Sequence, residues 1–286
     1  MLSRLASWLG RVPTLDLIAL VASNRIERWR EYRRIRHARA FRELTWRIPV
    51  ERLDLVDGLW HFEAEVHDRP VRFALRRGTS DVLAYLQVIV AGEYAPAASF
   101  LDGIEHPRII DAGGNVGLTT LWFKTAFPDA SVIALEPEPD NMTSFRRHLD
   151  LNRIEGVEAL PMALWTAPGA MEGDWGFRRG EAWGFSVRPA NGAASTNTVQ
   201  ATTISALLDD AGWETVDLLK IDIEGAEAEL LRDPATLETL KTRVRSICLE
   251  IHPERIDWPE AEAILLECGF GVRRDGETLF GSRPAE

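Results

Sequence analysis

A turn of small residues between an apolar segment and a helical one constrains this chain more than any other feature. An apolar segment that ends at Ile110 runs into the turn at 111–117, and residues 118–123 follow with a helical pattern. The next apolar segment ends on Glu136, 19 residues after Gly117. This order of strand, glycine turn, helix, strand and acid is typical of a nucleoside-binding site. The glycines let a ligand approach the backbone closely, and the acid accepts hydrogen bonds from both ribose hydroxyls.

Predicted strands and helices alternate from residue 108 onward. Apolar strand patterns cover residues 108–111, 131–135, 157–160, 216–221 and 246–251, with helical patterns after most of them. This alternation predicts an α/β fold with a Rossmann-like, doubly wound, mostly parallel sheet. The segment at 171–197, rich in Gly and Trp, is predicted to be irregular.

Two further segments are predicted before this domain of residues 102–286. Residues 48–101 alternate apolar and polar positions between short turns, and we expect a small antiparallel meander followed by a lead-in helix. Residues 1–47 are expected to form a basic helical extension, because nine arginines but only three glutamates lie between Arg25 and Arg47. Two interpretations stay open: a solvated helix packed on the main domain, or contact through 25–47 with a membrane surface, an anionic partner or another subunit.

Charge, cysteine content and hydropathy narrow the class of protein. The net charge of −11 argues against a general nucleic-acid binder. Cys248 and Cys268 have no metal-ligand spacing and are too few for a disulfide scaffold, so we expect a reducing, cytoplasmic setting, with a peripheral membrane position as an alternative. The apolar run at 15–22 is short and contains Asp16, so no membrane span is expected.

The polar residues that follow the predicted strands are the candidate site residues. Ligands of open parallel sheets bind outside the carboxyl ends of the strands. The candidates there are Asp111, Glu136 with Pro137, Met162 with Ala163, Asp222 with Glu224, and Glu250 with His252. We expect Glu136 and Pro137 to bind a ribose, and Met162 and Ala163 either to contact an adenine edge or to pack in the core.

The residue sequence of the turn distinguishes between possible cofactors. Asp111 stands two residues before the first of the glycines, and the turn residues are Gly113, Gly114, Asn115 and Gly117. An acid at this position resembles that of S-adenosylmethionine sites, where a carboxylate binds the ammonium group of the cofactor. The Asp111 carboxylate can instead stabilise the turn by hydrogen bonds to its backbone. A nicotinamide-binding fold prefers Gly-x-Gly-x-x-Gly, which differs from the order of residues in this turn. No phosphate-binding lysine follows the turn, so a nucleoside triphosphate site is not expected either.

These motifs together resemble the FkbM-type family of S-adenosylmethionine-dependent methyltransferases. The resemblance extends from about Thr79 to His252, and its most specific part is the run Lys-Ile-Asp-Ile-Glu-Gly-Ala-Glu at 220–227. Gly114 stands where the family often has Ala. The resemblance implies methyl transfer to a hydroxyl of a sugar, glycolipid or polyketide, and it does not extend to the basic N-terminal segment. The acidic main domain argues against a nucleic acid as partner.

The chemistry of such a transfer suggests roles for the remaining candidates. A hydroxyl must lose its proton, so we expect Asp222 or His252 to be the base, with Glu250 orienting His252. No metal is assigned, although Mg²⁺ held by Asp222, Glu224, Glu250 and His252 is a second hypothesis. The aromatic residues of the long segment form either a wall over a sugar or a lid packed on itself; they are Trp175, Phe177, Trp183 and Phe185.

Two rival functions remain open. A nicotinamide-dependent oxidoreductase uses a related fold, and a cofactor-binding assay separates it from a methyltransferase. A non-catalytic, cofactor-binding scaffold would bind the cofactor without transfer and recruit a partner or a membrane through the basic helix.

Overall fold

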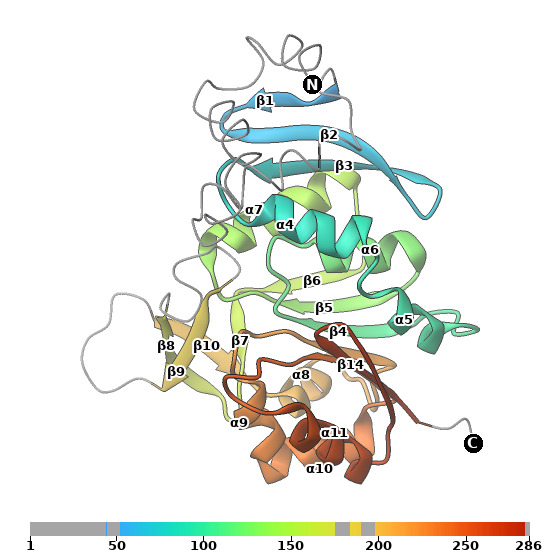
Figure 1. The fold of residues 1–286 in the computed structure, drawn as a ribbon, viewed down its shortest axis with the longest axis vertical. Helices are drawn as coiled ribbons and strands as arrows, with labels where there is room; N and C mark the ends of the chain where they lie inside the picture. Colours follow the sequence, from blue (N-terminus) through green and yellow to red (C-terminus); the bar gives the residue numbers. More distant parts are fainter. Residues whose placement is uncertain (1–43, 45–51, 175–183, 190–197, 284–286) are drawn as a thin grey trace, which may run out of the picture.

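A seven-stranded sheet forms the centre of the computed structural model, which describes Leu44 and residues 52–174, 184–189 and 198–283 (Figure 1). Five strands run parallel in the order β12-β11-β4-β5-β6, and β14 and β13 continue the sheet antiparallel beyond β12. These strands are β4 (Arg108–Ala112), β5 (Ser131–Leu135), β6 (Val157–Leu160), β11 (Leu218–Ile221), β12 (Ser246–Glu250), β13 (Gly271–Asp275) and β14 (Thr278–Ser282). The predicted doubly wound, mostly parallel sheet is therefore confirmed.

Both faces of this sheet are buried, and successive strand residues pack on opposite faces. In β4, Ile109 belongs to the core on one face and Ile110 to the core on the other. In Figure 1, α6 (Leu118–Ala126) and α7 (Pro139–Asn152) cover one face. The other face is covered by α8 (Ile204–Asp210), α9 (Glu227–Arg232), α10 (Pro234–Arg243) and α11 (Trp258–Glu267).

Side-chain caps fix where several of these helices begin. Thr203, Asp233 and Asp257 each accept a hydrogen bond from the backbone N–H three residues later, and a proline stands at the first turn of α10 and α11. Helix α10 was not predicted from the sequence, although Asp233 followed by Pro234 is an N-cap signal of this kind.

The predicted meander is present as an antiparallel sheet of β1 (Asp54–Val56), β2 (Leu59–Val66) and β3 (Arg69–Arg76). It packs on α7 and α4, on the side of α6 and α7 that faces away from the central sheet (Figure 1). The lead-in helix differs from the prediction, because α4 (Asp81–Ala84) passes into a π-helix, η3 (Tyr85–Val90). Two short helices, α5 (Ala95–Ala98) and η4 (Ser99–Leu101), follow before β4.

The segment predicted to be irregular contains strands of a second sheet. Four strands pair in the order β7-β10-β8-β9, with bounds β7 (Met162–Leu164), β8 (Gly169–Asp174), β9 (Ser186–Pro189) and β10 (Thr198–Thr202). The prediction of an irregular segment at 171–197 is therefore wrong for β8 and β9. Their backbone hydrogen bonds run to partners far along the sequence, which a local pattern does not reveal.

Residues 1–43 and 45–51, and with them the predicted basic helix apart from Leu44, lie outside the described residues. Leu44 itself is buried in the core beside the meander. Among the helices that the structure describes, none combines the length and the apolar character needed to cross a bilayer.

Candidate active site

The site lies where the order of the central strands reverses. The chain passes from β4 to β5 and β6 on one side, and returns to β11 on the other side of β4. A pocket opens at the carboxyl ends of these strands, the place where open α/β sheets bind ligands. Of the residues predicted for the site, those that line this pocket are Gly113, Gly114, Asn115, Glu136, Pro137, Met162, Ala163, Asp222, Glu224 and Glu250.

The glycine turn forms one wall of the pocket and packs against the end of β11. Gly113 has a φ of +85°, and a Cβ atom there would collide with the backbone carbonyl of Asp222. Asn115 also has a left-handed backbone, with a φ of +48°, a conformation that asparagine tolerates better than most residues. Gly117 does not line the pocket; it packs against Phe145 and precedes α6. The turn therefore needs glycine for packing as well as for ligand approach.

Glu136 faces the pocket from the end of β5. Its carboxylate accepts hydrogen bonds from the backbone N–H of Asn115 at 2.7 Å and of Glu138 at 2.8 Å, and a longer one from Asn141 at 3.4 Å. Burial raises the pKa of Glu136 to about 7, against the lowering effect of these hydrogen bonds. A carboxylate offers about four acceptor positions, so Glu136 retains capacity for a ligand hydroxyl.

The second sheet also contributes residues to the lining of the pocket. Met162 and Ala163 of β7 line the pocket, as does Val187 of β9. Of the aromatic residues proposed for a wall or lid, Phe185 lines the pocket, and the others lie outside the described residues.

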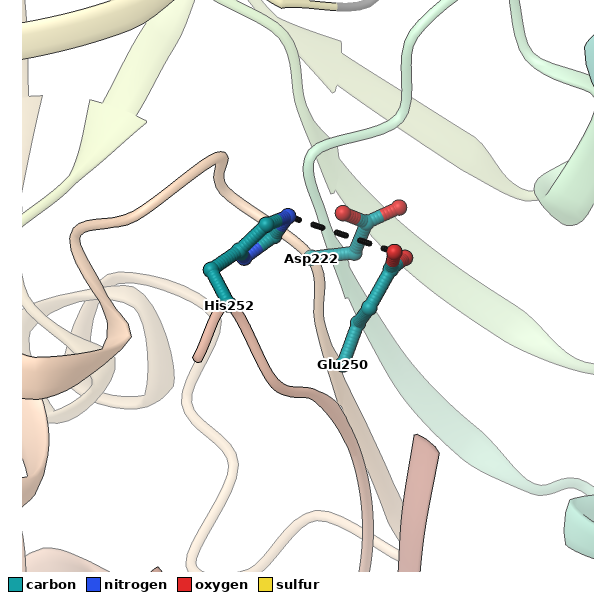
Figure 2. A group of neighbouring side chains, drawn as sticks. All are labelled: Asp222, Glu250 and His252. Carbon is teal, nitrogen blue, oxygen red and sulfur yellow. Dashed lines mark ion pairs between the residues drawn. The ribbon is translucent and has the colours of Figure 1, made fainter. Parts of the chain in front are cut away.

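Asp222 follows β11 and Glu250 ends the neighbouring strand β12, and their side chains lie close together (Figure 2). Both residues line the pocket. A ligand atom from each of Asp222, Glu250 and His252 lies within 4.8 Å of the others. Burial raises the pKa of Glu250 well above its usual range, and the neighbouring Asp222 raises it further. Glu250 therefore keeps its proton to a higher pH than an ordinary glutamate, and Asp222, whose side chain is 25% exposed, is the more accessible acid.

His252 does not line the pocket and lies behind the loop that follows β11. Its Nδ1 is 3.0 Å from Glu227 Oε1 and its Nε2 is 3.3 Å from Glu224 Oε2, whereas Glu250 Oε1 is 3.9 Å from Nε2. Burial lowers the pKa of His252, but the carboxylates of Glu224 and Glu227 outweigh burial and raise it to about 11. The structure thus places His252 as a cation between Glu224 and Glu227, both nearer to it than Glu250.

Asp111 is fully buried behind the turn rather than on the pocket wall. Its carboxylate accepts a hydrogen bond from the Thr120 hydroxyl at 2.6 Å and pairs with Lys220 at 3.2 Å. Asp111 is connected to the turn through Lys220, which donates a hydrogen bond to the Gly113 carbonyl, and both roles that the sequence left open for Asp111 stay predictions. Lys220, which also lines the pocket, was not among the predicted site residues. A lysine in the otherwise apolar strand 218–221 was the available signal.

Two further carboxylates reach the pocket from outside the central strands. Glu93 follows η3 and accepts a hydrogen bond from Gln87 at 2.8 Å, and Glu277 lies in the turn between β13 and β14. Burial raises the pKa of Glu93 to about 7, and repulsion from Asp222 and Glu277 adds to the effect. Sequence reasoning missed both acids as site residues, because contacts between distant segments bring them to the pocket.

The residues present fit S-adenosylmethionine. Among the described residues, Asn115 Oδ1 is buried without a hydrogen-bond partner and thus offers an acceptor to a ligand. Glu136 retains acceptor capacity beside it, and the side chains of Met162 and Ala163 provide an apolar surface for a flat base. Asp222, Glu250 and His252 also offer one ligand atom each to a divalent metal, and His252 would have to release its proton to bind it.

Comparison with known proteins agrees with this chemistry. The family described as "Methyltransferase FkbM domain" matches residues 111–272. "Methyltransferase sdnD" of Sordaria araneosa is 30% identical over 198 residues, which are 59% of this chain and 76% of that protein. "Methyltransferase 1" of Beauveria bassiana is 28% identical, covering 57% of this chain and 72% of its own. The N-terminal domain of EvdMO1, solved with SAH bound, is 17% identical with a TM-score of 0.40, covering 89% of this chain and 98% of that chain.

Proposed function

The chain belongs to the FkbM family of S-adenosylmethionine-dependent methyltransferases, and from this premise we propose that it methylates a hydroxyl oxygen of a sugar, glycolipid or other small natural product. The observation that carries this proposal is the position of Asp222. Its carboxylate is partly exposed on the wall of the pocket, at the strand end directly beside the glycine turn.

The turn side of the pocket is proposed to hold the cofactor. Glu136 would accept from the ribose hydroxyls, with Pro137 beside it, and Asn115 Oδ1 would accept from a further donor of the ligand. Met162 and Ala163 would lie against the adenine ring. When bound, S-adenosylmethionine supplies an electrophilic methyl group attached to a positively charged sulfur.

Asp222 is proposed to accept the proton of the acceptor hydroxyl. An alcohol is a weak nucleophile until a base within hydrogen-bond reach takes its proton as the new bond forms. The raised pKa of Glu250 favours its protonated form, which can donate a hydrogen bond to Asp222 or to the acceptor and so orient the reacting oxygen. Of the two bases that the sequence left open, Asp222 is the one we propose, since His252 is already protonated at neutral pH.

A small, uncharged or cationic acceptor suits this pocket better than a nucleic acid. Glu93, Asp222, Glu224, Glu250 and Glu277 line the pocket, and Lys220 is paired with carboxylates. Phosphate groups would be repelled from such a wall. Contact with a membrane or a partner through residues 25–47 stays a prediction.

A titration followed by an acceptor screen tests the proposal. Calorimetry with S-adenosylhomocysteine should show binding, and a panel of sugars, glycolipids and hydroxylated small molecules should reveal an acceptor that consumes the donor. Transfer of a ¹³C-labelled methyl group then shows by its chemical shift whether oxygen, nitrogen or carbon is methylated. Methylation of nitrogen or carbon would contradict the proposal, whereas binding without any transfer would favour a scaffold.

The Asp222→Asn variant tests the role of the base. We expect turnover to fall by about 10²–10⁴-fold, with little change in S-adenosylhomocysteine affinity. Asp217→Asn is the matched control, because Asp217 stands just before the opposite end of β11, where it is buried and accepts a hydrogen bond from Arg108 N at 2.8 Å. Equal turnover of Asp222→Asn and the wild type would exclude Asp222 as the base.

A further inference from the structure

Lys220 is a buried lysine in the middle of the sheet. It lies in β11 between apolar neighbours, and its side chain is 1% exposed. The ammonium group donates a hydrogen bond to the backbone carbonyl of Gly113 at 2.7 Å. It also lies 3.2 Å from Asp111 Oδ1 and 3.6 Å from Asp222 Oδ2. A lysine has three N–H donors, and the structure provides an acceptor near each of them.

The charge of Lys220 is maintained despite its burial. Burial alone lowers the pKa of Lys220, but Asp111 and Asp222 outweigh this effect and raise it above its usual range. The aromatic ring of Tyr94, whose centroid is 5.8 Å from Nζ, lies over the ammonium group. Lys220 is therefore a permanent cation between two carboxylates, and removing it would leave both of them uncompensated.

The contacts of Lys220 connect the buried residue Asp111 to Asp222, the proposed base on the pocket wall. Asp111 is fully buried and held by Thr120, so it has little freedom to move. Asp222 lines the pocket and is partly exposed. Lys220 lies between the two and also binds the turn through Gly113, so it fixes Asp222 relative to the cofactor wall.

We propose that Lys220 is a positioning residue that holds the Asp222 carboxylate in register with the glycine turn. This inference rests on the proposed role of Asp222 in proton transfer. A methyl transfer needs the acceptor oxygen, the methyl carbon and the sulfur in line, and an error of about 1 Å costs about 10²-fold in rate. The ion pairs of Lys220 with Asp111 and Asp222 would keep the Asp222 carboxylate in the position that this alignment requires. The wider guanidinium of an arginine would not reproduce the compact ammonium at this buried position.

Lys220→Met tests the proposal, because it removes the charge and keeps the length of the side chain. We expect turnover to fall by about 10²-fold or more, whereas the Kd for S-adenosylhomocysteine rises by less than about 10-fold. Lys124→Met is the matched control. Lys124 is also buried, and it donates hydrogen bonds to the carbonyls of Pro128 and Ala130 at the far end of α6. That variant should lose stability without a change in kcat.

A double variant shows whether Lys220 acts through Asp222. The turnover of Lys220→Met/Asp222→Asn should equal that of Asp222→Asn alone, because the lysine has no carboxylate left to position. Multiplying losses in the double variant would overturn the proposal. The proposal would also be overturned if Lys220→Met and Lys124→Met lost turnover in the same proportion to their loss of melting temperature, because lower stability alone would then explain the effect.

A crystal structure of Lys220→Met with S-adenosylhomocysteine gives a readout that needs no acceptor. We expect the Asp222 side chain to adopt a different rotamer while Asp111 stays on Thr120. An unchanged Asp222 rotamer would overturn the inference even if no acceptor has been found. Failure of the acceptor screen with a displaced Asp222 would instead count against the proposed function alone.

Discussion

The backbone N–H of Asp222 donates a hydrogen bond of 3.0 Å to the carbonyl oxygen of Ala112. This bond continues the pairing of β11 with β4 to the point where both strands end. The first residue after β4 is Gly113, so the backbone of the cofactor turn and that of the proposed base are in direct contact. A change in either loop is therefore expected to affect cofactor binding and proton transfer together.

Gly113→Ala tests this contact. The new methyl group would collide with the Asp222 carbonyl, and both loops would have to separate. We expect a loss of about 2–4 kcal/mol in unfolding free energy and at least about a 10-fold loss of S-adenosylhomocysteine affinity, measured by denaturation and calorimetry. Gly103→Ala is the control, because Gly103 has a similar φ of +81° but open space around it. Gly103→Ala should show only the strain of about 1–2 kcal/mol. Equal effects of the two variants on binding would contradict the argument.

The parallel sheet and the cofactor wall were predictable because their signals are local. Apolar runs of strand length, a glycine turn and an acid at the next strand end occur in consecutive residues. Gly113, Asn115 and Glu136 line the same pocket, and their contact with the cofactor stays a prediction. Asn115 even has the left-handed backbone that its residue type allows.

The acceptor side of the pocket was harder to predict because distant segments build it. Glu93 and Glu277 come from opposite ends of the folded chain, and no spacing in the sequence relates them. The surroundings of His252 depend on Glu227, which lies 25 positions away and on a helix. Charge states at this side follow from burial and from these neighbours, so the residue types alone were insufficient.

His252 and His148 are both fully buried, but they carry different charges. His148 Nε2 accepts a hydrogen bond from Ala74 N at 3.1 Å, and burial lowers its pKa, so it is neutral. His252 contacts carboxylates, which outweigh burial and raise its pKa from 6.5 to about 11. Its stabilising effect is therefore complete below about pH 6.5 and is lost as the pH rises towards about 11.

His252→Gln should therefore be destabilised by about 3–5 kcal/mol at neutral pH, because Glu224 and Glu227 lose their cation. The difference in unfolding free energy from the wild type should shrink between about pH 6.5 and 11. Chemical denaturation across this range is the measurement. His148→Gln is the control, with a loss that does not shrink in the same range. A pH-independent loss in His252→Gln would show that the histidine is neutral in the folded protein.

Glu136 gives cofactor binding a pH dependence. The pKa of this residue in the folded protein is about 7, so its carboxylate gains a proton and loses acceptor capacity below that pH. We expect S-adenosylhomocysteine affinity to fall by up to about 10-fold per pH unit below pH 7, and Glu136→Gln to bind about 10–100-fold more weakly at pH 8. Calorimetry at several pH values measures both effects.

Glu138→Gln is the control for this prediction. Glu138 is also buried and accepts a backbone hydrogen bond, from Asn141, but it is not among the described residues that line the pocket. It should keep a pH dependence, with a midpoint at a lower pH than in the wild type, because the charge of Glu138 contributes to the raised pKa of Glu136. A Glu136→Gln variant with the same pH dependence would exclude Glu136 as its origin.

Glu93 lowers the stability of the folded protein above neutral pH. Burial, with repulsion from Asp222 and Glu277, raises the pKa of Glu93 from 4.5 to about 7, and Gln87 and Lys220 offset part of this shift. Between these pH values the folded state holds a proton that the unfolded state releases. The free energy of unfolding therefore decreases as the pH rises from about 4.5 to about 7 and stays lower above it.

Glu93→Gln should remove this cost, because a neutral amide can still accept from Gln87. We expect the variant to match the wild type at pH 4.5 and to exceed its unfolding free energy by about 1–3 kcal/mol at pH 8, with the exposed Glu158→Gln variant as control. If Glu93 also contacts the acceptor, the stabilised variant will turn over more slowly at saturating donor, with a raised KM for the acceptor. A Glu93→Gln variant that is less stable than the wild type at pH 8 would show that Lys220 stabilises the charged carboxylate by more than burial destabilises it.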